Sequence, residues 1–110
     1  MLNSVILVGR LTKDVEVVET EKGYKRTYIT LAVPRSFKNA DGDVDTDFIS
    51  CVLWNSLAEH TCEYCKKGDV VGIKGRIETS SYEKDGEVKY TSEIIAEKVT
   101  FLSSKSKEAE

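Results

Sequence analysis

Residues 47–54 read DFISCVLW, and this stretch decides the fold. Its β-branched and aromatic side chains favour a strand. Side chains alternate along a strand, so the odd positions share one face and the even positions the other. The odd set suits a closed core and comprises Ile49, Cys51 and Leu53. The even set, predicted to face away from that core, comprises Phe48, Ser50, Val52 and Trp54.

Two more strands are predicted before this one. Residues 4–11 are rich in Val, Ile and Leu, and residues 24–33 form a β-rich run that stops at Pro34. Proline lacks the backbone donor of a sheet, so we expect it to end that strand. A charged stretch separates the two runs, with room for a short strand piece at residues 15–18. Residues 36–47 are polar and predict a long exposed hairpin loop.

One helix is predicted directly after residues 47–54. Ser56 and Glu59 have the spacing of a capping box, in which each side chain bonds the backbone at the other residue. Lys66-Lys67-Gly68 supplies a C-terminal stop. Apolar residues recur between them at helical spacing, which indicates a helix of about three turns packed on the sheet.

Two strands follow the helix. In residues 70–82 the inward positions are Val71, Ile73 and Ile77, and the outward positions are Lys74, Arg76, Ser80 and Tyr82. Gly72 and Gly75 in this run indicate sharp curvature or a close backbone approach. Asp85-Gly86 marks a hairpin turn before the last strand, residues 87–101.

The predicted order is therefore three strands, one helix and two strands. Short strands with a single helix between the third and fourth are typical of an all-β, five-stranded OB-fold barrel. We expect one domain at residues 1–102 and a short polar tail at residues 103–110.

Composition restricts the class of protein. The 110 residues carry a net charge of −3. Binding to nucleic acid would therefore depend on a local basic face and not on the charge of the whole protein. The longest apolar run is residues 5–8, far short of a membrane span, and no signal-peptide pattern precedes it. Three cysteines without a framework spacing predict reduced thiols. We expect a cytoplasmic protein without a membrane partner.

Four aromatic residues are candidates for a binding surface. Phe48 and Trp54 share the even face of residues 47–54, Phe37 lies in the predicted loop, and Tyr82 ends the fourth strand. Exposed rings stack on bases of any identity, and each stack contributes about 1–3 kcal/mol. Nearby cations that could neutralise phosphates are Arg10, Arg35, Lys38, Lys74 and Arg76. The same exposed row also fits a sheet-on-sheet or oligomer interface, and the pattern alone leaves both readings open.

Several motifs resemble the bacterial single-stranded DNA-binding proteins. The resemblance runs from about residue 1 to residue 102, in order and with compatible spacing. Its motifs are VILVGRLTKD (residues 5–14), TLAV (30–33), RSFKN (35–39), DFI (47–49) with Trp54, LAE (57–59), YCKKG (64–68), GRI (75–77) with Tyr82, and TSE (91–93).

This resemblance implies an OB fold, assembled as a homotetramer around which single-stranded DNA wraps. The base-stacking positions of the family fall on Phe37, Phe48, Trp54 and Tyr82. It implies sequence-nonspecific binding that protects single strands in replication, recombination, repair or DNA uptake by competent cells. The expected place is the cytoplasm, associated with the nucleoid.

The chain departs from the family at specific positions. Ser56, Glu78 and Ser80 stand where members often have basic residues, and Val15 replaces a usual proline. We therefore expect weaker phosphate binding and a shallower salt dependence. Long members end in an acidic, phenylalanine-terminated tip that recruits repair and replication enzymes. Because this sequence ends at residues 107–110 without such a tip, it resembles the short competence-associated, phage or mobile-element versions, and recruitment through a tail is not expected.

Other kinds of site have little support. Cys62 and Cys65 have a zinc-like spacing, with His60 nearby, but there is no second closely spaced pair. Both cysteines fall late in the predicted helix, where the helix dipole disfavours a thiolate. His60 is the single histidine and has no nucleophile partner in a recognisable motif. We expect no enzyme activity, no metal and no cofactor.

Two other functions remain as alternatives. An OB-fold replication-accessory or protein-interaction module with weak nucleic-acid binding fits the acidic balance and the missing basic positions. Single-stranded RNA is the third possibility, because stacking alone does not read the 2′-hydroxyl.

Overall fold

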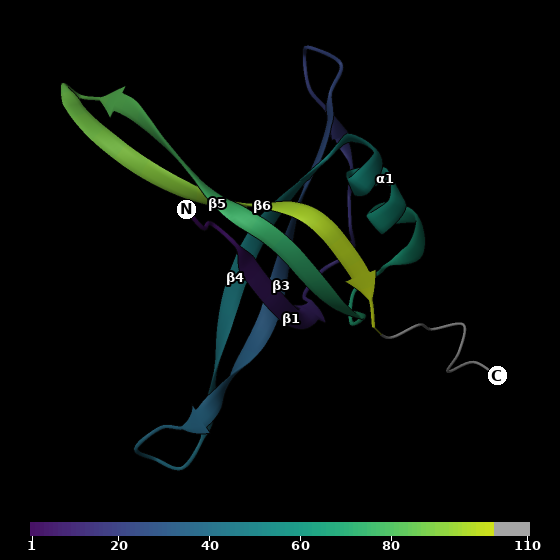
Figure 1. Cartoon of the computed structure of the whole chain (residues 1–110), viewed down its shortest axis with the longest axis vertical. Coiled ribbons are helices and arrows are strands. Elements are labelled where there is room, and N and C mark those ends of the chain that lie inside the picture. Colours follow the sequence, from purple (N-terminus) through teal and green to yellow (C-terminus); the bar gives the residue numbers. More distant parts are fainter. Residues whose placement is uncertain (103–110) are drawn as a thin grey trace.

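The computed structural model describes residues 1–102, which form six strands and one helix (Figure 1). The elements in chain order are β1 (Val5–Leu11), β2 (Val18–Glu19), β3 (Lys25–Lys38), β4 (Val44–Trp54), α1 (Asn55–Tyr64), β5 (Val70–Lys84) and β6 (Glu87–Phe101). The predicted tail at residues 103–110 lies outside the described residues. The extent of the single domain stays a prediction.

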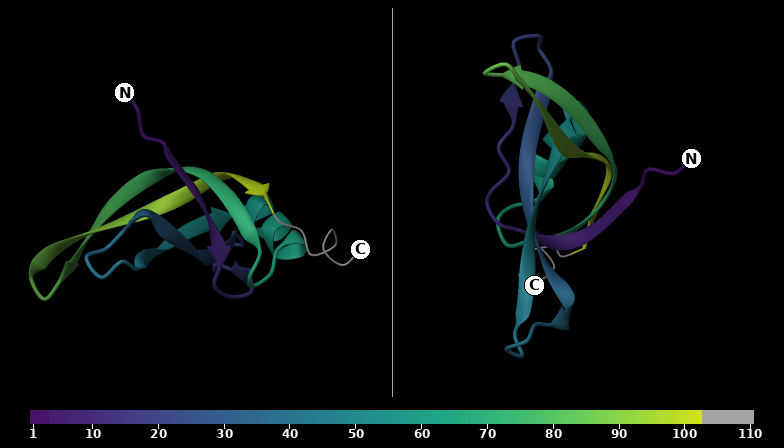
Figure 2. Two further views of the ribbon diagram at one scale, coloured as in Figure 1. Left: turned by 90° about the horizontal axis from the view of Figure 1, so that it is seen from below. Right: turned by 90° about the vertical axis from the view of Figure 1, so that its left-hand side faces the viewer.

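Five of the strands close into a barrel. They are hydrogen-bonded in the order β1-β5-β6-β4-β3, and β1 also pairs with β3, which closes the ring. β2 adds a short edge beside β3. Viewed from the side in Figure 2, the strands wrap around a common interior. The prediction of a five-stranded OB barrel with one helix between its third and fourth strands is confirmed.

The core lies inside this ring. Alternate residues of the five barrel strands point inward, and the fully buried aliphatic side chains include Ile29, Leu31, Leu53, Val71 and Ile73. The helix packs on β3, β4 and β6, where Ala58 and Thr61 are fully buried. Cys51 is buried as its odd position predicted, and Ile49 is half-buried.

The predicted end of the second run at Pro34 is wrong. β3 continues to Lys38, and Pro34 pairs in register with Thr46 before the register shifts. Beyond Ala32 the described part of β3 has β4 as its one partner strand, so the proline nitrogen can face the open side, as on other edge strands. The predicted long loop is therefore mostly strand, and the turn occupies residues 39–43. Figure 1 shows this hairpin as an arm below the barrel.

The predicted capping box is also wrong. The residue before α1 is Trp54, and no side chain hydrogen-bonds to the start of the helix. Asn55 takes a left-handed φ of 53°, and its side-chain oxygen accepts a hydrogen bond from the backbone N–H of Lys25 at 3.2 Å. Glu59 instead pairs with the Lys25 ammonium at 2.9 Å. Contacts to β3 thus replace a local cap.

The β5–β6 hairpin forms a second arm, which extends to the upper left in Figure 1. At its base the register shifts between Lys74 and Gly75, and a Cβ at Gly75 would collide with the backbone carbonyl of Ile95. The close approach predicted for this glycine is confirmed, whereas Gly72 makes only ordinary contacts. Ile77 keeps the inward parity but is 45% exposed.

Candidate nucleic-acid interface

The outward face of β3 and β4 presents a continuous row of cross-strand pairs. Directly opposed residues of an antiparallel pair lie on one face. Phe48 opposes Ala32, and Trp54 opposes Arg26. The hydroxyl oxygens of Ser50 and Thr30, between these pairs, lie 3.3 Å apart. Phe48 is 68% exposed and Trp54 37% exposed, so both predicted rings are accessible. With a rise of about 3.4 Å per residue they lie about 20 Å apart along β4.

Trp54 belongs to a cluster with a cation and a second ring. The guanidinium carbon of Arg26 lies 5.9 Å from the centre of the Trp54 ring and 5.1 Å from that of Tyr28. These distances are within the range of cation–π attraction. A guanidinium plane and an aromatic ring are both surfaces on which a base can stack. The cluster is thus a preformed platform on the outward face.

Val52 shows what covers the middle of this row. It lies outside the main core cluster, as its even position predicted, and yet its side chain is only 1% exposed. Tyr28 opposes Val52 from β3, and the Tyr28 hydroxyl donates a 3.2 Å hydrogen bond to Glu93 on β6. Since β4 lies between β3 and β6, the Tyr28 side chain must cross the outward face of β4. Val52 is buried beneath it.

The environment of Tyr28 also changes its acidity. Partial burial raises the pKa of the Tyr28 hydroxyl, and the negative charge of Glu93 and the hydrogen bond to it raise that pKa further. The hydroxyl therefore keeps its proton and stays a donor to Glu93 at any physiological pH.

The other two predicted stacking residues lie on the arms. Phe37 is near the end of β3, on the arm that β3 forms with β4, and Tyr82 is on the β5–β6 arm, opposite Lys89. Both are exposed. The structure therefore joins Phe48 and Trp54 on one strand and places Phe37 and Tyr82 on separate extensions of the barrel (Figure 1).

Arg35 is held by carboxylates of its own hairpin. Its Nε and Nη2 donate to Asp47 at 3.0–3.3 Å, and Asp45 lies 3.8 Å from Nη1. The hydrogen bond from Arg35 holds the pKa of Asp47 below its ordinary value, although partial burial opposes this. Asp47 is therefore ionised at neutral pH, and it accepts hydrogen bonds from Nε and Nη2 of Arg35.

The two cations predicted on β5 are paired in the same way. Lys74 lies 3.6 Å from Glu97, and Arg76 lies 2.7 Å from Glu78 and 3.4 Å from Glu97. The hydrogen bond to Glu78 raises the pKa of Arg76. These pairs are exposed, and such pairs are worth little in water, so an incoming phosphate can exchange with the carboxylates.

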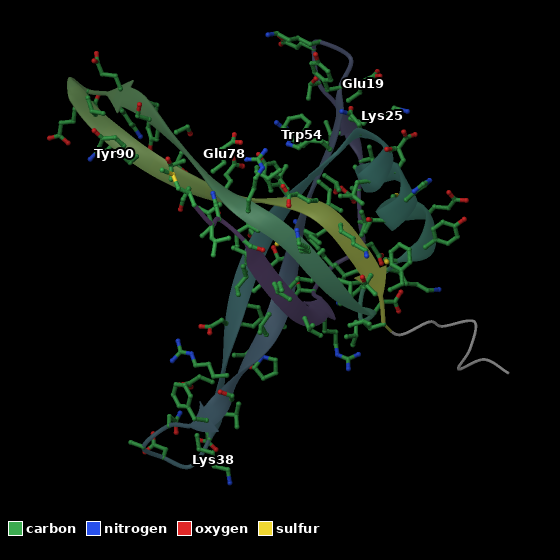
Figure 3. The ribbon with its side chains drawn as sticks, in the orientation of Figure 1. Glu19, Lys25, Lys38, Trp54, Glu78 and Tyr90 are labelled. Atoms are coloured by element: carbon green, nitrogen blue, oxygen red, sulfur yellow. The ribbon has the colours of Figure 1, made fainter. Side chains whose placement is uncertain are left out.

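Arg10 and Lys38 differ from the other three predicted cations. Arg10 opposes Ala32, the partner of Phe48, and its guanidinium donates to the backbone oxygen of Gly68 at 2.6 Å. Lys38 lies by the tip of the β3–β4 arm, well away from Glu78 (Figure 3). Within residues 1–102 its ammonium makes no ion pair or hydrogen bond. Lys38 is the predicted cation most open to a phosphate.

Arg26, Tyr28 and Glu93 were missed by the sequence predictions. Arg26 and Tyr28 alternate with the buried residues Thr27 and Ile29. The same period of two that selected Phe48 and Trp54 places them on the outward face. No local pattern pointed to Glu93, because its hydrogen bond to Tyr28 depends on β6 lying beside β4.

Two further observations concern other kinds of site. Among residues 1–102 no three His, Cys, Asp or Glu side chains gather as metal ligands would, and no helix there is long and apolar enough to span a membrane. The three thiols are free: Cys51 and Cys65 are buried, and Cys62 is exposed.

Comparison with known proteins gives a family match. Residues 2–102 match the model of the single-strand binding protein family. The chain is 48% identical to single-stranded DNA-binding protein B of Bacillus subtilis (strain 168) over 109 residues, covering 98% of this chain and 96% of that protein. It is 49% identical over 106 residues to single-stranded DNA-binding protein 3 of Listeria innocua, covering 96% of this chain and 66% of that protein.

A solved structure shares the fold. The crystal structure of a deletion mutant of the single-stranded DNA binding protein from Thermus aquaticus superposes with a TM-score of 0.77 at 28% identity. The match covers 94% of this chain and 52% of the Thermus chain. This chain thus spans about half of that protein.

Proposed function

The chain belongs to the single-strand binding protein family, and on that basis we propose that it binds single-stranded DNA by stacking bases on its outward face and pairing phosphates with nearby cations. The observation that supports the mechanism most directly is the exposure of Phe48 and Trp54 on one face of β4, with Arg26 packed against Trp54. A base has a π face whatever its identity, so this row binds without a fixed sequence.

The path of the strand follows from the placement of the four rings. Phe48 and Trp54 form its centre, and Phe37 and Tyr82 engage it on the two arms. Arg10, Arg35, Lys38, Lys74 and Arg76 contact the phosphates. Three of these cations, Arg35, Lys74 and Arg76, already pair with carboxylates, so binding exchanges those contacts for phosphate and releases few counterions. The salt dependence is therefore shallow.

The test is a competition measured by anisotropy of a labelled oligonucleotide. Single-stranded DNA should bind, duplex of the same length should not compete, and a matched RNA strand reports the DNA preference. Trp54→Ala should weaken binding by about 1–3 kcal/mol. Tyr64→Ala, which removes an exposed ring on α1 that contacts Phe101, is the matched control and should leave DNA binding unchanged. If single strands fail to bind, this proposal is wrong and the chain is better explained as an OB-fold protein-interaction module.

The assembly proposed is a homotetramer. In the described chain, residues 5–8 of β1 pair only with β5, which leaves a strand edge free. Beside it Ile6, Val8 and Leu102 are exposed apolar side chains that line one shallow groove. Free edges and apolar patches of this kind are places where protein chains associate. Light scattering should give the mass of a tetramer for the unaltered protein and a smaller mass for Val8→Lys.

The biological role follows from binding without sequence preference. The protein coats and protects single strands that arise in the cytoplasm during replication, recombination, repair or DNA uptake. The proposal includes no catalytic step and no cofactor.

A further inference from the structure

Arg26 is an outward-facing cation of β3 whose guanidinium has no acidic partner. It alternates with the buried Thr27 and lies directly opposite Trp54 of β4. Within residues 1–102 the guanidinium makes no ion pair and donates no hydrogen bond. An arginine side chain has five N–H donors and no acceptor. In the described chain all five donors of Arg26 are therefore left for an external acceptor, although the side chain is half-buried.

The neighbours of Arg26 on the outward face carry no charge. Val18 opposes it from β2, Trp54 opposes it from β4, and Tyr28 is the next outward residue of β3. Two of these neighbours are rings, and the guanidinium carbon lies 5.9 Å from the centre of the Trp54 ring and 5.1 Å from that of Tyr28. Cation–π attraction depends on the charge and requires none of the N–H donors. The two rings thus hold the cation without neutralising it.

The carboxylates next to this cluster are engaged by other groups. Glu93 accepts the hydrogen bond from the Tyr28 hydroxyl at 3.2 Å and makes no ion pair with Arg26. Lys25, which precedes Arg26 in the chain, pairs with Glu59 at 2.9 Å. In this respect Arg26 differs from the cations of the two arms that pair with carboxylates. A phosphate that reaches Arg26 displaces no acidic side chain of the described chain.

We propose that Arg26 is a phosphate ligand at the centre of the DNA path, beside the base that stacks on Trp54. The inference rests on the proposed binding of single-stranded DNA and adds a cation to the five already named. Each base of a strand is joined through its sugar to a phosphate, so a base on Trp54 brings a phosphate close to the residue opposite. A guanidinium binds phosphate with two parallel N–H groups, and a planar fork already held between rings loses little freedom.

The contribution of Arg26 should be visible in the salt dependence of binding. A contact that displaces no carboxylate releases the counterions of its phosphate in full. The experiment titrates oligo-dT at several salt concentrations with the wild-type protein and Arg26→Gln, which removes the charge and keeps a polar side chain. Affinity at low salt should fall several-fold in the variant. The slope of log affinity against log salt should become shallower by about 0.7, the share of one phosphate contact.

A conservative variant separates the charge from the shape of the side chain. Arg26→Lys keeps the positive charge but lacks the planar fork. It should therefore retain the wild-type salt slope while binding oligo-dT less tightly. A salt slope for Arg26→Lys as shallow as that of Arg26→Gln would contradict a phosphate contact made through the charge at this position.

The matched control is Lys22→Gln. Lys22 is exposed in the turn between β2 and β3, and its replacement removes the same charge. It should leave the salt slope unchanged. The proposal is overturned if Arg26→Gln changes nothing, if it lowers affinity at an unaltered slope, so that Arg26 only supports stacking, or if Lys22→Gln has the same effect. In each of these cases DNA binding stands. If the wild-type protein does not bind oligo-dT, the proposed function fails and this inference with it.

Discussion

Arg35 and Asp47 face each other across the β3–β4 arm as a two-pronged pair, with Nε and Nη2 of the guanidinium donating to the carboxylate. This is the geometry with which arginine binds phosphate. The carboxylate of Asp47 is thus paired with Arg35, a cation that the sequence predicts to contact DNA phosphates. The same arrangement recurs at Lys74 and Arg76, where Glu97 and Glu78 are the partners. On the proposed function, these intramolecular carboxylates compete with phosphate for the three cations.

Asp47→Asn tests this competition directly. The substitution frees Arg35 for a phosphate, so affinity for oligo-dT should rise, and the slope of log affinity against log salt should steepen by about 0.7 for one added contact. The measurement is a titration at several salt concentrations. Asp41→Asn, a turn residue of the same arm whose carboxylate makes no ion pair in the described chain, is the control for the change in net charge. Equal effects of the two substitutions would contradict the account.

Gly75→Ala tests the close approach at the base of the β5–β6 arm. The added Cβ would collide with the carbonyl of Ile95, which is backbone and has no freedom to move aside. The free energy of unfolding should fall by about 1–3 kcal/mol, as for other overpacked sites. Gly72→Ala on the same strand meets its nearest side-chain atom at 3.5 Å and should be close to neutral. Denaturant unfolding of both variants provides the comparison.

Thr27→Val should stabilise the barrel. The Thr27 hydroxyl is buried and has no hydrogen-bond partner in residues 1–102, which costs free energy that a methyl group does not. The expected gain in unfolding free energy is about 1 kcal/mol. Thr61→Val should instead destabilise the protein, because the equally buried Thr61 hydroxyl donates a hydrogen bond to the Leu57 carbonyl at 2.8 Å. If both substitutions destabilise the protein, the Thr27 hydroxyl does have a hydrogen-bond partner in solution.

The cysteines should differ sharply in reactivity. Burial raises the pKa of both Cys51 and Cys65 to about 11, so at pH 8 these thiols are protonated as well as covered. Thiolates are the reactive form, and Cys62 is exposed. A thiol reagent at pH 8 should therefore label one cysteine quickly, and Cys62→Ser should abolish that fast phase. Rapid labelling of two cysteines in the native protein would show that one of the buried thiols readily becomes exposed to solvent.

Local patterns predicted the architecture well where they fixed the alternation of side chains. The even and odd positions of residues 47–54 gave the inward Cys51 and Leu53 and the outward Phe48 and Trp54. They placed Val52 on the outward face correctly but did not show that it is buried, because a residue that points outward can still be covered by a side chain from another strand. Tyr28 reaches it only because β3, β4 and β6 are neighbours, which no local window shows.

The strand and helix ends were harder to predict for the same reason. Pro34 can continue β3 because that part of the strand has one open side, and Glu59 pairs with Lys25 rather than capping its own helix. The partners of the predicted cations could not be predicted from the sequence. Their residue types indicated phosphate contacts, but the carboxylates beside Arg35 and Arg76 became visible only with the register of the sheet.

The most direct test of the proposed function is the fluorescence of Trp54 during titration with a long oligo-dT at low and moderate salt. The chain has one tryptophan, so the signal comes from the proposed stacking residue. We expect quenching that saturates, is absent with duplex DNA and weakens only modestly with salt. Unchanged fluorescence together with no shift in mobility of the oligomer would contradict single-strand binding by this face.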